Sequence, residues 1–437
     1  MACIAIIIAY IKCFAPYGKG RIVSVLHFLL QKLAKRLKVS YNHTIQFLKG
    51  VNIMKKILAV LMVLCLMLPA FAVAENPVVK IGVFECASGD SGAGGKQEML
   101  GMQYANKVAP TVTIGDTEYK VELVYADNGS TTDKAPSAAA ELVSQNVSVV
   151  IGSYGSGVSI AGSPVFEQAG IPVIGVSCTN PQVTLGNTHY FRICFLDPFQ
   201  GKVLANYAKK EMGADIVYCL GELGNDYDQG LIHYFQQEFE ALGGMVVAES
   251  FPTGTSDFTS YINNATGYGA GVFFSPCSIA YATLIVDQAA GQNVAFPIMA
   301  GDTWDNNVVL ESATGTNLQV LIDTFYQEGG NAEFDNGFKA WLNSDAEALT
   351  NNGGNDIIAA VSAMGYDAYF VALEALKAAG STDSKAVNEA LWNVTIEGVT
   401  GKIAFDEVGD AARDTAYIKS INTATGAWEL VTVQGVN

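Results

Sequence analysis

Residues 146–181 decide the fold, and they run NVSVVIGSYGSGVSIAGSPVFEQAGIPVIGVSCTNP. A mainly β-branched apolar run from Val147 to Ile151 stops at a glycine-serine turn, and a second run from Val173 to Val176 stops at Ser177. Two such runs, separated by a segment of helical length, predict a strand–helix–strand unit. Two parallel strands would then end side by side, and ligands of open parallel sheets bind beyond that edge.

The turn after the first of these strands suits an anion. Gly155 and Gly157 flank Ser156, so the backbone can approach a ligand closely while the following helix supplies partial positive charge at its amino end. GSYGSG is neither the GxGxxG pattern of dinucleotide sites nor a Walker A loop, because no Lys-Ser/Thr follows it. A carboxylate fits this turn, although an ordinary strand-to-helix turn without a ligand has the same spacing.

Strand and helix patterns alternate on both sides of this stretch. Such alternation predicts an α/β protein with parallel sheets and right-handed crossovers, and 437 residues suffice for two or three domains. We predict strands at 78–84, 120–126, 215–220, 245–251, 270–275 and 297–300, helices at 96–108, 133–145, 200–212, 227–242, 278–291, 334–349 and 356–379, and a final hairpin of 399–410 with 417–433, joined by 423–426.

The charge is unevenly distributed along the chain. Ten of the 25 Lys and Arg residues lie in 1–74, which contains no Asp or Glu, so the remainder has 15 basic against 42 acidic residues and a formal charge of −27. A surface of this sign repels nucleic acid phosphates and favours solubility. We therefore expect no nucleic acid partner.

Residues 54–74 have the pattern of a secretory signal peptide. Lys55 and Lys56 precede twelve apolar residues, 57–68, and the segment ends in a small-residue site at Ala74, where we expect cleavage and export to the periplasm. Leu64 stands before Cys65 where a lipoprotein signal has a small residue, which favours a free soluble protein. We expect 1–53 to be an untranslated upstream extension; alternatively, 31–48 has the apolar spacing of a helix-turn-helix.

The sequence shows no apparatus for catalysis, metal binding or cofactor binding. Only His189 and His233 follow residue 74, and neither lies near a GxSxG, HExxH or CxxC motif. The acidic turn 225–228 lacks EF-hand spacing, so we interpret it as a solvated turn. Five cysteines follow residue 74, an odd number whose spacing predicts no disulfide framework; they are Cys86, Cys178, Cys194, Cys219 and Cys277.

From Val78 to the C-terminus the chain resembles the leucine/isoleucine/valine-binding branch of type I periplasmic binding proteins. The AGIPVI and S-x-TNP segments within 146–181 carry the likeness, with 189–193 and the 221–230 loop in support. The resemblance implies two Rossmann-like lobes, each a parallel sheet flanked by helices, joined by a three-strand hinge. It places 77–197 and 327–402 in the first lobe and 198–326 and 403–437 in the second.

The resemblance also implies a ligand site between the lobes. The carboxylate of an amino acid would bind Ser156, Thr179 and adjoining N–H groups, and its ammonium would meet the Ser177 carbonyl, Thr179 and Asp302, with Tyr227 closing over it. Positions 91 and 94 stand where the family has a proline or a large aromatic, so we expect that wall to be thin or the pocket to be larger. The expected ligand-binding residues are Ser91, Tyr154, Gly155, Ser156, Ser177, Thr179, Tyr227, Cys277, Asp302 and Trp304, with Gly94 and Ser275 beside them.

The function that the resemblance implies is capture of an amino acid or similar small zwitterion for an ABC importer, whose membrane permease would be the partner. The protein would act as a monomer without a cofactor or metal and would not be an enzyme. Two alternatives share this core: a ligand-sensing regulator that uses the helix-turn-helix, and a periplasmic sensor without transport.

Overall fold

The computed structural model describes residues 76–435, together with the single residues Lys32, Lys35 and Ala59. Apart from those single positions, the predicted signal peptide at 54–74 and the upstream segment 1–53 lie outside the described residues. Among the residues described, no helix combines the length and the apolar character needed to cross a membrane.

The first lobe, as we use the term, is built on a six-stranded sheet with the order β2-β3-β1-β4-β5-β6. Every neighbouring pair is parallel except β2–β3, which places an antiparallel strand at one edge. The strands are β1 (Val78–Glu85), β2 (Thr111–Ile114), β3 (Thr117–Asp127), β4 (Val149–Ile151), β5 (Val173–Gly175) and β6 (Tyr190–Arg192).

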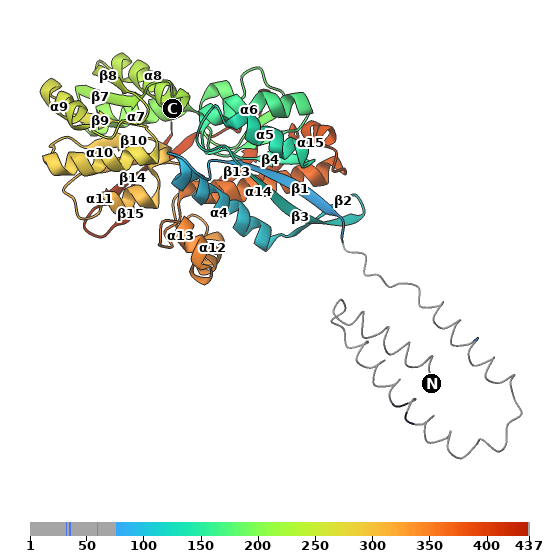
Figure 1. The fold of residues 1–437 in the computed structure, drawn as a ribbon. Helices are drawn as coiled ribbons and strands as arrows, with labels where there is room; N and C mark the ends of the chain where they lie inside the picture. Colours follow the sequence, from blue (N-terminus) through green and yellow to red (C-terminus); the bar gives the residue numbers. More distant parts are fainter. Residues whose placement is uncertain (1–31, 33–34, 36–58, 60–75, 436–437) are drawn as a thin grey trace, which may run out of the picture. The chain divides into compact units, whose positions relative to one another are not determined.

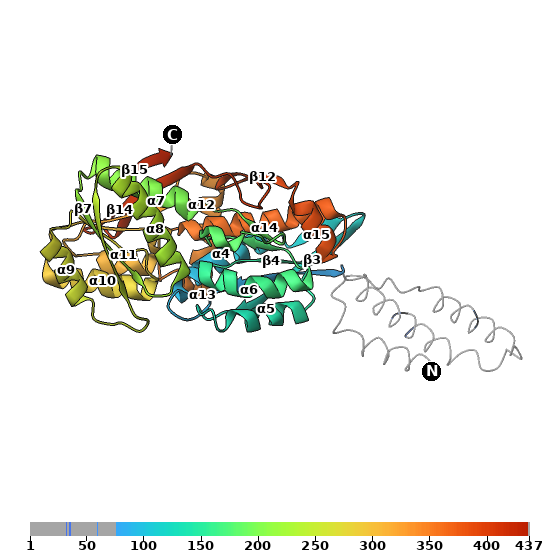
Figure 2. The same cartoon turned by 90° about the horizontal axis from the view of Figure 1, so that it is seen from above.

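Helices cover both faces of this sheet, with α5 and α6 on one side and α14 on the other (Figure 2). α4 packs along α14, and glycines make the approach close: a Cβ at Gly101 would lie 1.9 Å from the Ser362 carbonyl oxygen, and one at Gly365 would lie 2.3 Å from that of Glu98. The helices are α4 (Gly92–Val108), α5 (Ala135–Ser144), α6 (Ser156–Ala169), the short η2 (Pro181–Val183), α14 (Ala360–Ala379) and α15 (Ser384–Leu391).

The second lobe is built on a seven-stranded sheet with the order β15-β14-β11-β10-β9-β7-β8. Its strands are β7 (Ile216–Glu222), β8 (Met245–Phe251), β9 (Val272–Phe274), β10 (Ile298–Ala300), β11 (Val320–Thr324) and the antiparallel pair β14 (Thr415–Asn422) and β15 (Ala427–Gly435). Its helices, grouped around these strands in Figure 1, are α7 (Asp197–Asn206), η3 (Tyr207–Glu211), α8 (Asp226–Ala241), α9 (Thr259–Tyr268), α10 (Ile279–Gln292), η4 (Asp302–Trp304) and α11 (Asn307–Ala313).

The chain passes between the two sheets three times. The crossings follow β6, β11 and β13 (Gly401–Ala404), which pairs with β12 (Thr395–Gly398) in a two-stranded sheet beside α14. After β11 the chain forms α12 (Ala332–Ser344) and α13 (Ala346–Asn351), and α13 contacts α4. The predicted α/β architecture of two parallel-dominated, helix-flanked sheets is confirmed.

Several predicted element bounds were wrong. The helix expected from Lys96 begins at Gly92, four residues earlier. Gly95 in its first turn packs closely, since a Cβ there would lie 2.1 Å from the Cys86 carbonyl oxygen. The helix expected at 334–349 is broken at Asp345, whose side chain caps α13. The last predicted helix, α14, begins at Ala360 rather than 356, and a further helix, α15, follows it. Residues 399–410 supply β13 rather than half of the terminal hairpin, which is β14–β15.

Candidate functional site

A cavity of about 240 Å³ lies between the lobes, and each segment of its wall follows a strand. The volume is below the roughly 300–1,000 Å³ of pockets for drug-sized ligands, which limits the occupant to a small molecule. The first lobe contributes Cys86, Asp90, Ser91, Ser130, Thr131, Thr132, Tyr154, Gly155, Ser156, Gly157, Val158 and Ser177, and the second contributes Glu222, Leu223, Gly224, Asn225, Asp226, Tyr227, Thr253, Ser278 and Thr303.

The amino end of α6 forms part of the first-lobe wall. Gly155 is the N-cap residue and provides no side-chain cap, so the first N–H groups of the helix receive no hydrogen bond acceptor from it. Ser156, the first residue of the helix, is 2 % exposed, and its Oγ accepts a hydrogen bond from the Asn180 N–H at 3.2 Å. Free N–H groups at a helix amino end favour an anion.

A pair of buried carboxyls lies behind this wall. The Ser177 hydroxyl donates to Glu98 Oε2, and Glu85 Oε2 accepts from the backbone N–H groups of Cys86 at 3.2 Å and Tyr154 at 3.0 Å. Burial raises the pKa of Glu98 to about 7, and burial with the neighbouring Glu98 charge raises that of Glu85. The Ser177 hydroxyl is therefore engaged with an acid inside the lobe.

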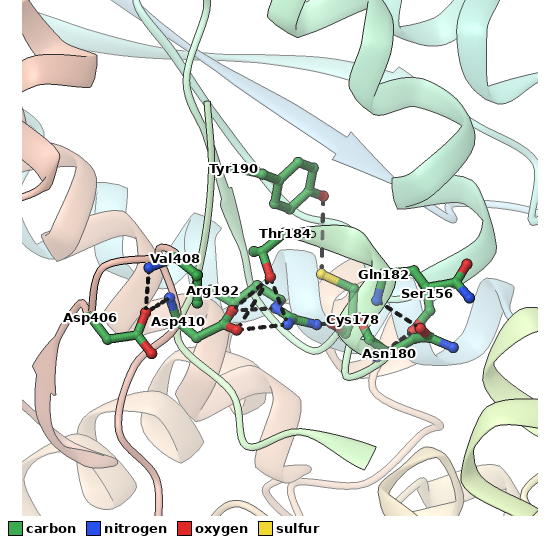
Figure 3. Close-up of polar contacts among 10 residues, drawn as sticks. All are labelled: Ser156, Cys178, Asn180, Gln182, Thr184, Tyr190, Arg192, Asp406, Val408 and Asp410. Atoms are coloured by element: carbon green, nitrogen blue, oxygen red, sulfur yellow. Dashed lines mark hydrogen bonds and ion pairs between the residues drawn. The ribbon is translucent and has the colours of Figure 1, made fainter. Parts of the chain in front are cut away.

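Arg192 anchors the loop that carries Ser177 (Figure 3). Its fully buried guanidinium pairs with Asp410, with Nε 2.7 Å from Oδ1 and Nη2 3.0 Å from Oδ2. It also donates to the carbonyl oxygens of Cys178, at 3.0 Å, and Asn180, and to the Thr184 hydroxyl. One side chain thus joins the 177–181 loop to the third crossing between the lobes. Sequence reasoning gave Arg192 no role.

Asp302 lies just behind the second-lobe wall. It is 1 % exposed, and its Oδ1 accepts hydrogen bonds from the Tyr227 hydroxyl at 2.8 Å and Gln200 Nε2 at 2.6 Å. Burial raises the pKa of Asp302 to about 6, so the carboxylate prevails at neutral pH. Tyr227, at the start of α8, lines the cavity and lies between the cavity and the Asp302 carboxylate.

The remaining expected residues divide between the wall and the layer behind it. Ser91, Tyr154, Gly155, Ser156, Ser177 and Tyr227 line the cavity, whereas Thr179, Cys277, Asp302 and Trp304 are buried outside its lining. Trp304 Nε1 donates to the Cys277 carbonyl oxygen at 2.9 Å, which fixes one loop of the second lobe upon another.

The thin wall expected at positions 91 and 94 is filled by Tyr154. A Cβ at Gly94 would lie 2.3 Å from Cζ of Tyr154, so the absence of a side chain there admits the ring. The Tyr154 hydroxyl then crosses to the second lobe and donates to the Thr303 carbonyl oxygen at 2.8 Å. Ser91 Oγ, 3.4 Å from Ser278 Oγ, makes a second bond between the lobes.

The acidic turn 225–228 forms part of the site, and its interpretation as solvated was wrong for Asp228. This carboxyl is fully buried, and its Oδ2 accepts from the Glu222 N–H at 2.7 Å. Asn225 caps α8, and Asp226 lines the cavity. Sequence reasoning also missed Glu222, Thr253 and 130–132. The one signal that they share is a place in the loop that follows a predicted strand.

Metal and disulfide chemistry find no support in the part of the chain that the structure describes. No group of three or more His, Cys, Asp or Glu side chains there is arranged to hold a metal ion. Cys86, Cys178, Cys194, Cys219 and Cys277 are all buried and all free.

Comparisons with known proteins agree with this geometry. A family described as "Periplasmic binding protein" matches residues 78–426. The "Leu/Ile/Val-binding protein homolog 3" of Brucella melitensis is 28% identical over 355 residues, which cover 78% of this chain and 90% of that protein.

Solved structures give the same picture. The leucine binding protein LivK of Thermotoga maritima is 30% identical, with a TM-score of 0.73 over 82% of this chain and 99% of that one. LivJ of Streptococcus pneumoniae, solved in complex with isoleucine, is 26% identical, with a TM-score of 0.70 over 82% of this chain and 99% of that one.

Proposed function

Because the chain belongs to the periplasmic binding protein family, we propose that it captures a small α-amino acid between its lobes and delivers it to the membrane permease of an ABC importer. Membership confirms the resemblance read from residues 146–181. The names of the relatives support an amino acid as the ligand, since LivK is described as a leucine binding protein and LivJ was solved with isoleucine. Export through a signal peptide at 54–74 belongs to the same proposal.

The observation that carries the proposal is the polarity of the cavity. The uncapped amino end of α6 and the Ser156 hydroxyl lie on one side, and Tyr227 backed by Asp302 lies on the other. The ligand carboxylate would bind at Gly155 and Ser156, where charge-assisted hydrogen bonds are short and strong. The ammonium would donate to the Tyr227 hydroxyl oxygen, whose proton is committed to Asp302, so that the acid acts through the tyrosine.

Closure about the three crossings would couple binding to delivery. A ligand shifts a two-state equilibrium only by its differential affinity for the two states, so it must touch both lobes to favour the closed one. Bonds between the lobes surround the cavity, among them Tyr154 to Thr303 and the Asn180 amide to the Asp226 carbonyl oxygen at 2.8 Å. The permease would recognise the closed surface, and no bond of the ligand would be made or broken.

Calorimetry on the wild type and the Asp302→Asn variant tests the proposal. We expect the substitution to weaken binding of an α-amino acid about 10-fold or more, since a hydrogen bond to a charged group contributes about 1.5–3 kcal/mol. The affinity for an analogue that lacks the amino group should be the same in the variant and the wild type. Asp116→Asn, on the exposed β2–β3 turn, is the matched control.

Small-angle scattering with and without ligand gives an independent reading of closure. A radius of gyration and a melting temperature that no amino acid changes would contradict the proposal.

A further inference from the structure

The cavity wall carries three carboxylates, those of Asp90, Glu222 and Asp226. No Lys, Arg or His stands among the described residues that line it. A zwitterionic ligand has one ammonium, which the proposed site directs to Tyr227 and Asp302. Asp226 Oδ2 lies beside Gly157 in the first turn of α6, where the helix amino end favours a negative charge. Glu222 and Asp90 therefore remain as acids that a neutral amino acid does not require.

Glu222 is the most buried of these acids, with 8 % of its surface exposed. It ends β7, and neutral side chains hold both of its oxygens: Oε1 accepts from the Thr253 hydroxyl at 2.6 Å and Oε2 from the Asn225 amide at 3.2 Å. These bonds fix the direction of the carboxylate without offsetting its charge. A fixed, water-poor carboxylate at a ligand's surface is an efficient partner for a cation.

Asp90 brings a second carboxylate to the same place from the opposite lobe. The Tyr281 hydroxyl oxygen lies 3.3 Å from Asp90 Oδ2 and 3.4 Å from Glu222 Oε1, and it already accepts from the Gly254 N–H at 3.0 Å. Desolvation of the phenol raises the pKa of Tyr281 to about 12, so it keeps its proton, but that single proton satisfies only one acid at a time. The Tyr281 hydroxyl thus lies near two like charges, the buried Glu222 and the exposed Asp90, and a cation beside them would offset their repulsion.

Few aliphatic side chains line the wall, and the apolar part of its surface comes mainly from residues such as Tyr154 and Tyr227. Val158 and Leu223 are the only aliphatic side chains among the described lining residues, and Leu223 is 66 % exposed. An apolar group seated against Glu222 would also remove water from a carboxylate and return no hydrogen bond, which is costly. An aliphatic side chain placed beside Glu222 would therefore desolvate the carboxylate without a compensating hydrogen bond.

From these observations we propose that the ligand is an α-amino acid with a cationic side chain, an ammonium or guanidinium, and that Glu222, assisted by Asp90, selects it. The inference rests on the proposed function, because it assigns the ligand's backbone to α6 and Tyr227 and its side chain to the acidic corner.

Calorimetry with L-lysine and L-norleucine tests the charge directly, because the two share a four-carbon stem and differ in the terminal ammonium. We expect lysine to bind at least 10-fold more tightly at pH 7.5 and low ionic strength, with the advantage shrinking as salt screens it. L-Arginine, L-ornithine and L-leucine extend the series. Norleucine or leucine binding as tightly as lysine would overturn the inference and leave the proposed function standing, whereas an absence of binding by every amino acid would defeat the proposed function itself.

The Glu222→Gln variant assigns the preference to a residue. We expect its lysine affinity to fall at least 10-fold while norleucine affinity is kept or improved, because the amide preserves shape and removes charge. Glu389→Gln, exposed on α15, is the charge-matched control and should change neither affinity. An equal loss for both ligands in Glu222→Gln would contradict the assignment, and the wild-type comparison tests the inference even where this variant folds poorly.

Discussion

The two walls of the cavity occupy equivalent places and differ in chemistry. Both are made of segments that follow strands, yet the first-lobe wall consists mainly of hydroxyls and backbone N–H groups around α6, whereas the second-lobe wall contains Glu222 and Asp226. Buried acids lie behind both walls, Glu85 and Glu98 in the first lobe and Asp302 in the second. Sheet topology thus determines where a ligand binds. The residues after the strands determine whether a lobe binds the ligand's carboxylate or its ammonium group. Asp90 is the exception, an acid on the first-lobe wall.

The largest expected effect comes from removing the residue that holds the first-lobe wall in place. Arg192→Ala should lower the free energy of unfolding by about 3–5 kcal/mol, because it leaves the Asp410 carboxylate largely buried without its cation. Urea denaturation measures the change. Lys209→Met breaks the exposed Lys209–Asp215 pair and should cost no more than about 1 kcal/mol. Equal losses in the two variants would mean that the buried network has no special part in the first-lobe wall.

A smaller effect is expected where the two walls meet. Gly94→Ala introduces a Cβ into the space of the Tyr154 ring, and we expect a cost of about 1–3 kcal/mol together with weaker ligand binding, because the hydroxyl can no longer reach Thr303. Thermal unfolding and calorimetry report the two consequences.

Gly92→Ala is the matched control for this substitution. It lies in the same turn of α4, but its Cβ would have no neighbour closer than 3.5 Å, so the variant should be neutral or slightly stabilising. If both alanine variants had the same stability and affinity, the position of the Tyr154 ring would not depend on the absence of a side chain at Gly94.

The smallest expected effect concerns pH and the second-lobe wall alone. With the Asp302 pKa near 6, protonation removes the charge behind Tyr227, so this residue alone should make amino acid affinity about 10-fold lower at pH 5 than at pH 7. Calorimetry across this range should show the dependence in the wild type and lose it in Asp302→Asn. A wild-type affinity that did not change with pH would refute the electrostatic role of Asp302.

The contribution of Asp302 to folding stability depends on pH in the opposite direction from its contribution to ligand affinity. Its pKa is raised on folding, so the folded state holds the proton more tightly than the unfolded chain does. The contribution is therefore full below about pH 4 and is lost as the pH rises toward 6.

Local pattern was enough to predict the architecture because buried parallel strands are continuous apolar runs, as in Val149–Ile151. It missed β2, a four-residue edge strand, and the start of α4, where glycines lower helix propensity and packing overrides it. These are tertiary effects that a short window of sequence does not contain.

The site was predicted in part for a related reason. The glycine turn after a strand indicated Ser156, and the family resemblance indicated Tyr227 and Asp302. Neither signal encodes depth, so Asp302 and Trp304 were expected at the ligand and lie behind the wall. Arg192 was missed because Asp410, its partner, is 218 positions away in the sequence. Glu222 was missed because one acid after a strand resembles any other until its neighbours are known.

The five buried thiols would matter if the protein is exported, as proposed, to an oxidising compartment. Disulfide exchange proceeds through the thiolate, and burial raises the pKa of Cys86 and Cys178 to about 11, so at neutral pH neither is a ready nucleophile. Scrambled or intermolecular crosslinks would then form mainly during folding. In the folded protein Cys86, the single thiol among the described lining residues of the cavity, is the one that a bound ligand would shield from small oxidants.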